Sequence, residues 1–210
     1  MKKLLFFIMV LSFAACSKDD FDAGNPKNGQ KAELYVDHYS DVRNQMIFLY
    51  PQKDPSPLGL RGFEEREFGY TYKVKAKAYV SSEVVMDDGT NSWFNYDGMI
   101  SKERYTSQDR FEIGLVYHIG FGGSGGNLAI KQEDDKFLYG AGGTLRPANA
   151  AIRQQLADLL LREKAIGTAQ EYQDYQLLLN TLALKAVVTH DPENYGKGYL
   201  VHEIKQNLSI

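Results

Sequence analysis

FGYTYKVKAKAYV, residues Phe68–Val80, is the most regular stretch of the chain. From Tyr72 to Ala78, apolar side chains occupy every second position and lysines occupy the positions between them. Because successive side chains of a strand point to opposite faces of a sheet, this pattern predicts a long strand with one buried face and one wet face. We interpret the lysines of the wet face as solubilising, with a binding strip as the alternative. These lysines are Lys73, Lys75 and Lys77.

Further strands are predicted on both sides of this stretch. The turn residues 87–91 precede the aromatic segment Ser92–Tyr96, which we expect to return antiparallel to it. On the other side, Glu33–Tyr39 alternates, and Asn44–Tyr50 is rich in residues that favour strands. The turn-forming segment Pro51–Pro57 then ends this second strand.

A strand is also predicted for Phe111–Ile119, directly before the glycine-rich loop Gly120–Gly126. A phosphate-binding P-loop needs a lysine and a hydroxyl residue after its last glycine, and neither follows here. A dinucleotide fingerprint needs a helix at this point, whereas residues 128–131 are expected to form another strand. We therefore predict a hairpin tip or lid and no nucleotide site. The second glycine cluster, Gly140–Gly143, is expected to mark the exit from the sheet.

The last third of the chain changes to helical spacing. A first helix is predicted to begin near Pro147 and to end with Gly167 as its C-terminal cap. Its apolar side holds Ile152, Leu156, Leu159 and Leu160. A second helix is predicted to follow from the capping-box pattern Thr168–Glu171. Its apolar side holds Tyr172, Tyr175, Leu178, Leu179, Leu182 and Ala186.

Strands first and helices last indicate an α+β fold, with an antiparallel β-sheet in the N-terminal two thirds covered by a C-terminal helical hairpin. We expect residues 32–210 to form a single domain. Within it, 32–146 are mainly β, 147–186 form the helical hairpin and 187–210 form a C-terminal tail.

The N-terminal segment has the residue pattern of an export signal. Lys2 and Lys3 precede the apolar segment Leu4–Phe13, which has the length of a signal-peptide core and is too short to span a bilayer. Small residues then lead to Cys16, the only cysteine of the chain. The stretch resembles the lipobox of bacterial lipoproteins, which implies that residues 1–15 are removed and that Cys16 is lipidated and anchors the protein.

Acidic residues follow the cysteine. Ser17–Asp20, with Asp22 close behind, resembles the surface-export signal of Bacteroidota lipoproteins. This resemblance implies a lipid-anchored protein on the outer face of the outer membrane, with the periplasmic face as the alternative. A solvated acidic linker is the alternative interpretation of these residues. Residues 16–31 are expected to be a lipidated cysteine and a flexible tether, because almost no apolar residue occurs between 22 and 31.

Residues 32–106 resemble a small uncharacterised lipoprotein domain that often occurs beside META (HslJ-like) domains. The resemblance is carried by Tyr35–Val36, Gly62–Phe63, Gly69–Val74 and Trp93. The cysteines usual in that family are absent here, and nothing that resembles a META domain follows. The resemblance implies a small β domain of an envelope protein and brings no active-site residues with it.

The charge of the chain argues against a nucleic-acid-binding protein, and its cysteine content argues against a disulfide-stabilised fold. Without Lys2 and Lys3, 22 basic residues oppose 27 acidic ones, a formal charge of about −5. No clustered basic stretch occurs, so we predict no nucleic-acid partner. A single cysteine excludes an intramolecular disulfide, so the fold must be stabilised by packing.

No catalytic, cofactor-binding or metal-ligating set emerges from the remaining polar residues. His190, Asp191 and Glu193 cluster, with His202–Glu203 nearby, but metal-site spacing is lacking, and we expect a solvated loop. Paired carboxylates for glycoside hydrolysis are conceivable at Glu64, Glu65 and Glu67, although a solvated turn is the simpler interpretation. Ser124 lacks the strand and helix context of a nucleophile elbow.

The sequence therefore predicts a surface-exposed outer-membrane lipoprotein with a binding or structural role in the cell envelope. Its fourteen tyrosines and Trp93 would suit a glycan or protein ligand. The alternative is a glycan- or peptide-directed envelope hydrolase with an unrecognised active site.

Overall fold

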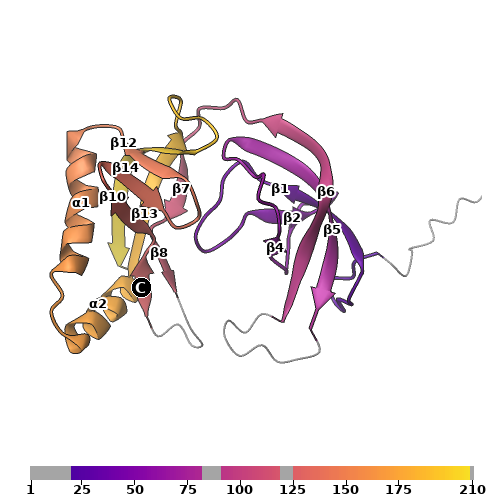
Figure 1. Cartoon of the computed structure of the whole chain (residues 1–210), viewed down its shortest axis with the longest axis horizontal. Helices are drawn as coiled ribbons and strands as arrows, with labels where there is room; N and C mark the ends of the chain where they lie inside the picture. Colours follow the sequence, from indigo (N-terminus) through magenta and orange to yellow (C-terminus); the bar gives the residue numbers. More distant parts are fainter. Residues whose placement is uncertain (1–19, 82–90, 119–124, 209–210) are drawn as a thin grey trace, which may run out of the picture.

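The structure, a computed structural model, describes residues 20–81, 91–118 and 125–208. Its strands form two lobes that lie side by side, each built around its own six-stranded sheet (Figure 1). Residues 20–105 supply the N-terminal lobe and residues 106–208 the C-terminal lobe. The predicted α+β class is confirmed, since two helices follow most of the strands. The β part differs from the expected single sheet, because it is divided between the two lobes and a two-stranded ribbon.

The N-terminal sheet has the strand order β3-β2-β1-β5-β6-β4, in which only the β4–β6 pair is parallel. Its strands are β1 (Lys31–Val36), β2 (Ile47–Leu49), β3 (Asp54–Pro55), β4 (Leu60–Arg61), β5 (Tyr70–Val80) and β6 (Ser92–Arg104).

Strand β5 lies between β1 and β6, and its alternation is as predicted. Tyr72, Val74, Ala76 and Ala78 are buried in the core of this lobe, where they join Leu34, Val36 and Phe94. On the opposite face, Lys73 pairs with Glu33 at 2.7 Å and Lys77 pairs with Asp97 at 2.9 Å. These pairs are consistent with the solubilising interpretation of the lysine face.

The N-terminal lobe begins earlier than the expected boundary at residue 32. Asp20 forms a parallel β-bridge with Lys31, and the ring of Phe21 lies edge-on to Phe94 at 4.7 Å between centroids. The backbone N–H of Gly29 donates to the carbonyl of Ala78. Residues 20–30, expected to belong to the tether, are therefore attached to the sheet, because Phe21 reaches an apolar site that composition alone did not indicate.

The C-terminal sheet has the strand order β10-β11-β12-β14-β13-β7, with a parallel β12–β14 pair. Its strands are β7 (Phe111–Gly114), β10 (Ile130–Glu133), β11 (Lys136–Tyr139), β12 (Thr144–Pro147), β13 (Leu182–His190) and β14 (Gly198–Leu208). Strands β8 (Val116–His118) and β9 (Gly126–Leu128) form the separate ribbon.

Helix α1 (Ala150–Lys164) buries the four predicted residues Ile152, Leu156, Leu159 and Leu160. Its N-cap is Asn149, whose side chain accepts a hydrogen bond from the N–H of Ile152 at 3.0 Å. Pro147 instead ends strand β12, and the C-cap is Ala165 rather than the predicted Gly167.

Helix α2 (Ala169–Thr181) starts with the predicted capping box. The hydroxyl of Thr168 accepts from the N–H of Glu171, and the Glu171 carboxylate accepts from the N–H of Thr168. The helix ends before the expected residue 186, because β13 begins at Leu182 and is rich in β-branched residues. Leu179 is buried, whereas Tyr172 and Leu178 of the predicted apolar side are exposed. The predicted tail 187–210 contains all of β14 and the end of β13.

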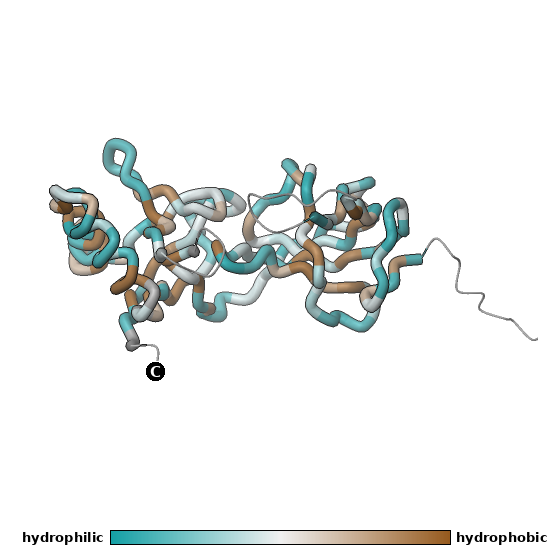
Figure 2. The backbone as a smooth tube through the Cα atoms, turned by 90° about the horizontal axis from the view of Figure 1, so that it is seen from below, coloured by the Kyte–Doolittle hydropathy of each residue, from teal (hydrophilic) through white to brown (hydrophobic). Residues whose placement is uncertain are grey.

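The two helices lie against different strands. Helix α1 contacts β10, β12 and β14, and α2 contacts β8, β9 and β13. The apolar residues of the C-terminal lobe form a core separate from that of the N-terminal lobe. Figure 2 shows apolar segments inside both lobes, with polar turns around them. Among the described residues, no helix combines the length and apolar character needed to cross a bilayer.

Candidate functional site at the lobe junction

The segment after β1 joins the lobes by entering the C-terminal core. The hydroxyl of Tyr199 accepts from the N–H of Ser40 at 2.9 Å and lies 3.2 Å from the carbonyl of Ser40. The hydroxyl of Tyr139 donates to the carbonyl of Gly114 at 2.9 Å and accepts from the N–H of Val42 at 3.2 Å. Two buried tyrosines thus hold the main chain of the N-terminal lobe by its polar groups.

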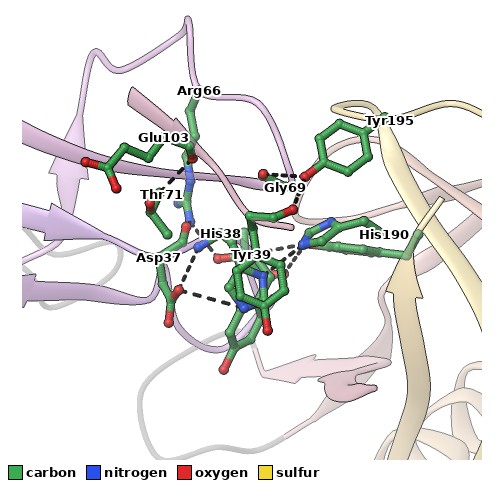
Figure 3. A network of polar contacts seen from close by, with 12 residues as sticks. Asp37, His38, Tyr39, Arg66, Gly69, Thr71, Glu103, His190 and Tyr195 are labelled. Carbon is green, nitrogen blue, oxygen red and sulfur yellow. Dashed lines mark hydrogen bonds and ion pairs between the residues drawn. The ribbon is translucent and has the colours of Figure 1, made fainter. Parts of the chain in front are cut away.

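Two histidines from opposite lobes meet beside this segment (Figure 3). His38 follows β1, His190 ends β13, and their Nδ1 and Nε2 atoms are 2.8 Å apart. The ring of Tyr105 stacks on His38 at 3.6 Å between centroids, and Phe111 lies 5.1 Å from His38 and 5.2 Å from His190. The histidine pair is therefore enclosed by aromatic rings.

The surroundings of the pair determine its protonation. The Nδ1 atom of His190 is buried and has no partner among the described residues. A buried N–H without an acceptor costs more than an unused lone pair, so we assign the proton of His190 to Nε2, which donates to Nδ1 of His38. Burial lowers the pKa of His190 to about 4, and the neighbouring His38 adds to this effect. Burial also lowers the pKa of His38, against the smaller opposing effect of Asp37. Both rings are neutral at pH 7.

Tyr195 and Arg66 make further contacts at the junction. The hydroxyl of Tyr195 lies 2.6 Å from the carbonyl oxygens of both Gly69 and Tyr105. A Cβ atom at Gly69 would lie 2.6 Å from the Tyr195 ring, and Gly69 has a φ of +80°, so only glycine fits this approach. Nη2 of Arg66 donates to the carbonyls of Tyr39 at 2.7 Å and Asp37 at 3.3 Å.

Three adjoining cavities open along this junction, and we call them together the junction groove. All three are lined by Ser40 of the N-terminal lobe and Ala141 of the C-terminal lobe. The Tyr117 cavity has a volume of about 650 Å³, the Lys197 cavity about 410 Å³ and the Glu64 cavity about 290 Å³. Each is named after one lining residue. Grooves between lobes are common places for ligands, because side chains from two bodies converge there.

The residues predicted to direct export are mostly beyond the described chain. Cys16 and Asp19 lie outside the described residues, whereas Asp20 and Asp22 lie at the start of the N-terminal lobe. Residues 120–124 of the glycine-rich loop also lie outside the described residues, as does Ser124 of the rejected nucleophile motif. Gly125 and Gly126 are buried where β9 starts.

The expected solvated loop at His190–Glu193 is different in the structure. His190 and Asp191 are 6% and 1% exposed, because His190 ends the core strand β13 and Asp191 follows directly after it. The guanidinium of Arg146 donates to both carboxylate oxygens of Asp191, at 2.7 to 3.0 Å. His202 instead contacts the hydroxyl of Thr189 at 3.0 Å. Across the described parts of the chain, no three His, Cys, Asp or Glu side chains are grouped to hold a metal ion.

The glutamates considered for glycoside hydrolysis have separate partners. Glu65 accepts from the hydroxyl of Tyr96, and Glu67 pairs with Lys102. Glu64 is exposed and lines the smallest cavity of the groove. The three glutamates therefore share one turn, but their carboxylates do not converge on a common position where a substrate could bind.

Of the histidine pair, only His190 stood out in the sequence, and it was expected in a solvated loop rather than at a contact between lobes. His38 and His190 are separated by 152 positions, so no local spacing connects them. The only local signal is the polar segment Asp37–Asp41, which interrupts an otherwise alternating strand. Comparison with protein-family models, curated proteins and solved structures gives no match for this chain.

Proposed function

We propose that this protein is a lipid-anchored binding protein on the outer surface of the outer membrane and that its ligand occupies the junction groove. The observation that carries the binding role is the groove itself, which both lobes line. The proposed anchor is Cys16, supported by the charged, apolar and small-residue order of residues 1–16. A glycan is the ligand class that we favour for a protein facing the cell exterior.

The chemistry of the groove favours binding over catalysis. Asp41, which lines the Tyr117 cavity, accepts hydrogen bonds from the backbone N–H groups of Gly114 and Arg43. Both carboxylate oxygens are therefore engaged by main-chain donors, so this side chain stabilises the junction and is poorly placed to act on a ligand. The hydroxyl of Tyr139 in the same cavity donates to the carbonyl of Gly114, and the backbone N–H of Ser40 donates to the hydroxyl of Tyr199.

The anchor is tested by Cys16→Ser, for which we expect loss of acylation and release from the membrane fraction. The lipid is the proposed attachment, and two or more acyl chains anchor stably where one does so only marginally. Normal membrane fractionation of the variant would contradict the proposal.

The ligand site is tested by binding of the purified protein to an array of glycans. Ala141→Phe places a ring where all three cavities meet, so we expect it to abolish glycan binding. Lys75→Ala, on the exposed face of β5, is the matched control and should bind as the unmodified protein does. Binding that survives Ala141→Phe would move the ligand away from the groove, and hydrolysis of an array glycan would favour the enzyme alternative.

A further inference from the structure

The Lys197 cavity is the positively charged part of the junction groove. Arg66 and Lys197 line it, and no carboxylate does. The Tyr117 cavity has Asp41 and Glu133 against Lys131, and the Glu64 cavity has one glutamate against Arg66. An anionic group that enters the groove is therefore attracted towards one end of it.

Arg66 has hydrogen-bond donors that the protein does not use. Its Nη2 atom is taken by two carbonyls, and no described residue accepts from its Nε or Nη1 atoms. None of its nitrogens is among the buried atoms without a partner, so the unused donors remain accessible. Arginine stays protonated at physiological pH. Arg66 thus presents a charged, partly unoccupied guanidinium at the cavity.

Arg66 also forms no ion pair with any described residue. Within the described residues, no carboxylate lies within ion-pair distance of Arg66 or of the Lys197 side chain, whereas Arg146 pairs with Asp191 at 2.7 Å. Asp37 acts on the Arg66 charge, but burial has the larger effect, so a bound anion would offset part of the remaining cost of desolvating this half-buried guanidinium. Burial lowers the pKa of Arg66, as expected for a desolvated cation.

The walls of the cavity leave room for a ligand. Phe63 and Phe68 supply rings, and the turn Gly142–Gly143 supplies a wall without side chains. Gly143 has a φ of +75°, and a Cβ atom there would lie 2.5 Å from the carbonyl oxygen of Lys197 and from the Phe68 ring. Glycine is therefore required at this close approach. A volume of about 410 Å³ is sufficient for one sugar residue.

We propose that the Lys197 cavity binds the carboxylate of an acidic sugar residue, with Arg66 and Lys197 as the cationic groups. This inference rests on the proposed function, because it assigns one subsite of the same groove. Charge-assisted hydrogen bonds from Arg66 would hold the carboxylate, Lys197 would add charge at the rim, and the rings of Phe63 and Phe68 would border the sugar. Neighbouring sugars of a longer chain would continue into the Glu64 or Tyr117 cavity.

The test is a titration of the purified protein with glucuronate, glucose and glucose 1-phosphate, followed by the NMR shifts of backbone amides. We expect glucuronate to shift the amides of Gly142, Gly143 and Gly196, and glucose at the same concentration to leave them unchanged. Lys197→Met should weaken glucuronate binding about threefold or more, in line with the loss of one exposed charge at the cavity rim. Lys131→Met, in the Tyr117 cavity, is the matched control and should have no effect.

Arg66→Met should weaken binding further, provided that its spectrum remains that of the folded protein. If this variant unfolds, Lys197→Met still decides the question, because its side chain has no partner among the described residues. Equal shifts for glucose and glucuronate, or glucuronate binding unchanged in Lys197→Met, would overturn the subsite. Tighter binding of glucose 1-phosphate would overturn the carboxylate assignment. Shifts confined to the amides near Lys131 would overturn the subsite while leaving the groove as a binding site, and glycan binding that survives Ala141→Phe would reject the groove itself.

Discussion

His190 shows how one residue makes the junction sensitive to acid. Its Nδ1 atom is buried without a partner, and Nε2 is 2.8 Å from His38. A proton added to either ring would place a charge among aromatic side chains or break the hydrogen bond between the rings. The folded protein therefore resists protonation of this pair, and burial lowers the pKa of both histidines.

This resistance predicts a pH dependence of stability. Between the ordinary value of 6.5 and the folded pKa of about 4, the unfolded chain binds a proton at residue 190 and the folded protein does not. The free energy of unfolding should therefore be unaffected by this group above pH 6.5 and fall on the order of 3 kcal/mol as pH drops to 4. Urea unfolding at a series of pH values from 4 to 7.5 measures this change in the free energy of unfolding. If the free energy of unfolding of the His190→Phe variant depended on pH to the same extent, the effect could not be assigned to His190.

The export interpretation gives a second prediction at the residue scale. Asp19→Ala combined with Asp20→Ala should leave the protein lipidated but reduce its cleavage by protease added to whole cells. The bridge of Asp20 to Lys31 is made by main-chain atoms, so alanine should retain it. Asp54→Ala serves as the control, because Asp54 is an exposed carboxylate outside residues 17–22. Unchanged surface cleavage in the double variant would mark residues 17–22 as a linker only.

At the scale of elements, each helix depends on a few leucines. Leu156 of α1 is 0% exposed and Leu179 of α2 is 3% exposed, both within the C-terminal core. Leu156→Ala or Leu179→Ala should lower the free energy of unfolding by about 2 to 5 kcal/mol, through lost burial and a residual cavity. Leu161→Ala is the matched control, since Leu161 is 58% exposed. Chemical unfolding of the three variants checks this, and equal losses in all of them would refute the placement of the helices.

The elements also show what a sequence can and cannot predict. The alternation of β5 and the apolar stripe of α1 were predicted because each has a period that only one element satisfies. The end of α2 was misplaced because Leu182 and Ala186 continue the helical spacing into β13, where Val187, Val188 and Thr189 favour a strand. The junction was not predictable, because its contacts join residues with no common period.

At the scale of the molecule, two cores imply different fates for two fragments. Residues 20–105 contain every residue of the N-terminal core, so this fragment should unfold cooperatively by itself. A fragment that ends at Arg146 should retain this folded lobe, but its residues 106–146 should stay unfolded or molten, because β7 and β12 lose their partners β13 and β14. Circular dichroism and thermal unfolding of both fragments check this. A second cooperative transition, from residues 106–146 of the longer fragment, would contradict this, because it would show that these strands fold without β13 and β14.

The attachment of Phe21 to Phe94 has a consequence for how the protein stands on a cell. The described chain starts on the side of the N-terminal lobe that faces away from the C-terminal lobe (Figure 1). With lipid at Cys16, as proposed, only three residues separate the anchor from Asp20, and the four residue steps between them span at most about 14 Å when extended. Such a short linker keeps the N-terminal lobe close to the lipid headgroups. It also limits how far the molecule can rise from the membrane and how far it can tilt relative to the membrane surface. The groove would then stay at a nearly constant distance from the membrane. The length of the linker therefore sets the effective concentration at which the groove meets a ligand attached to the same cell surface.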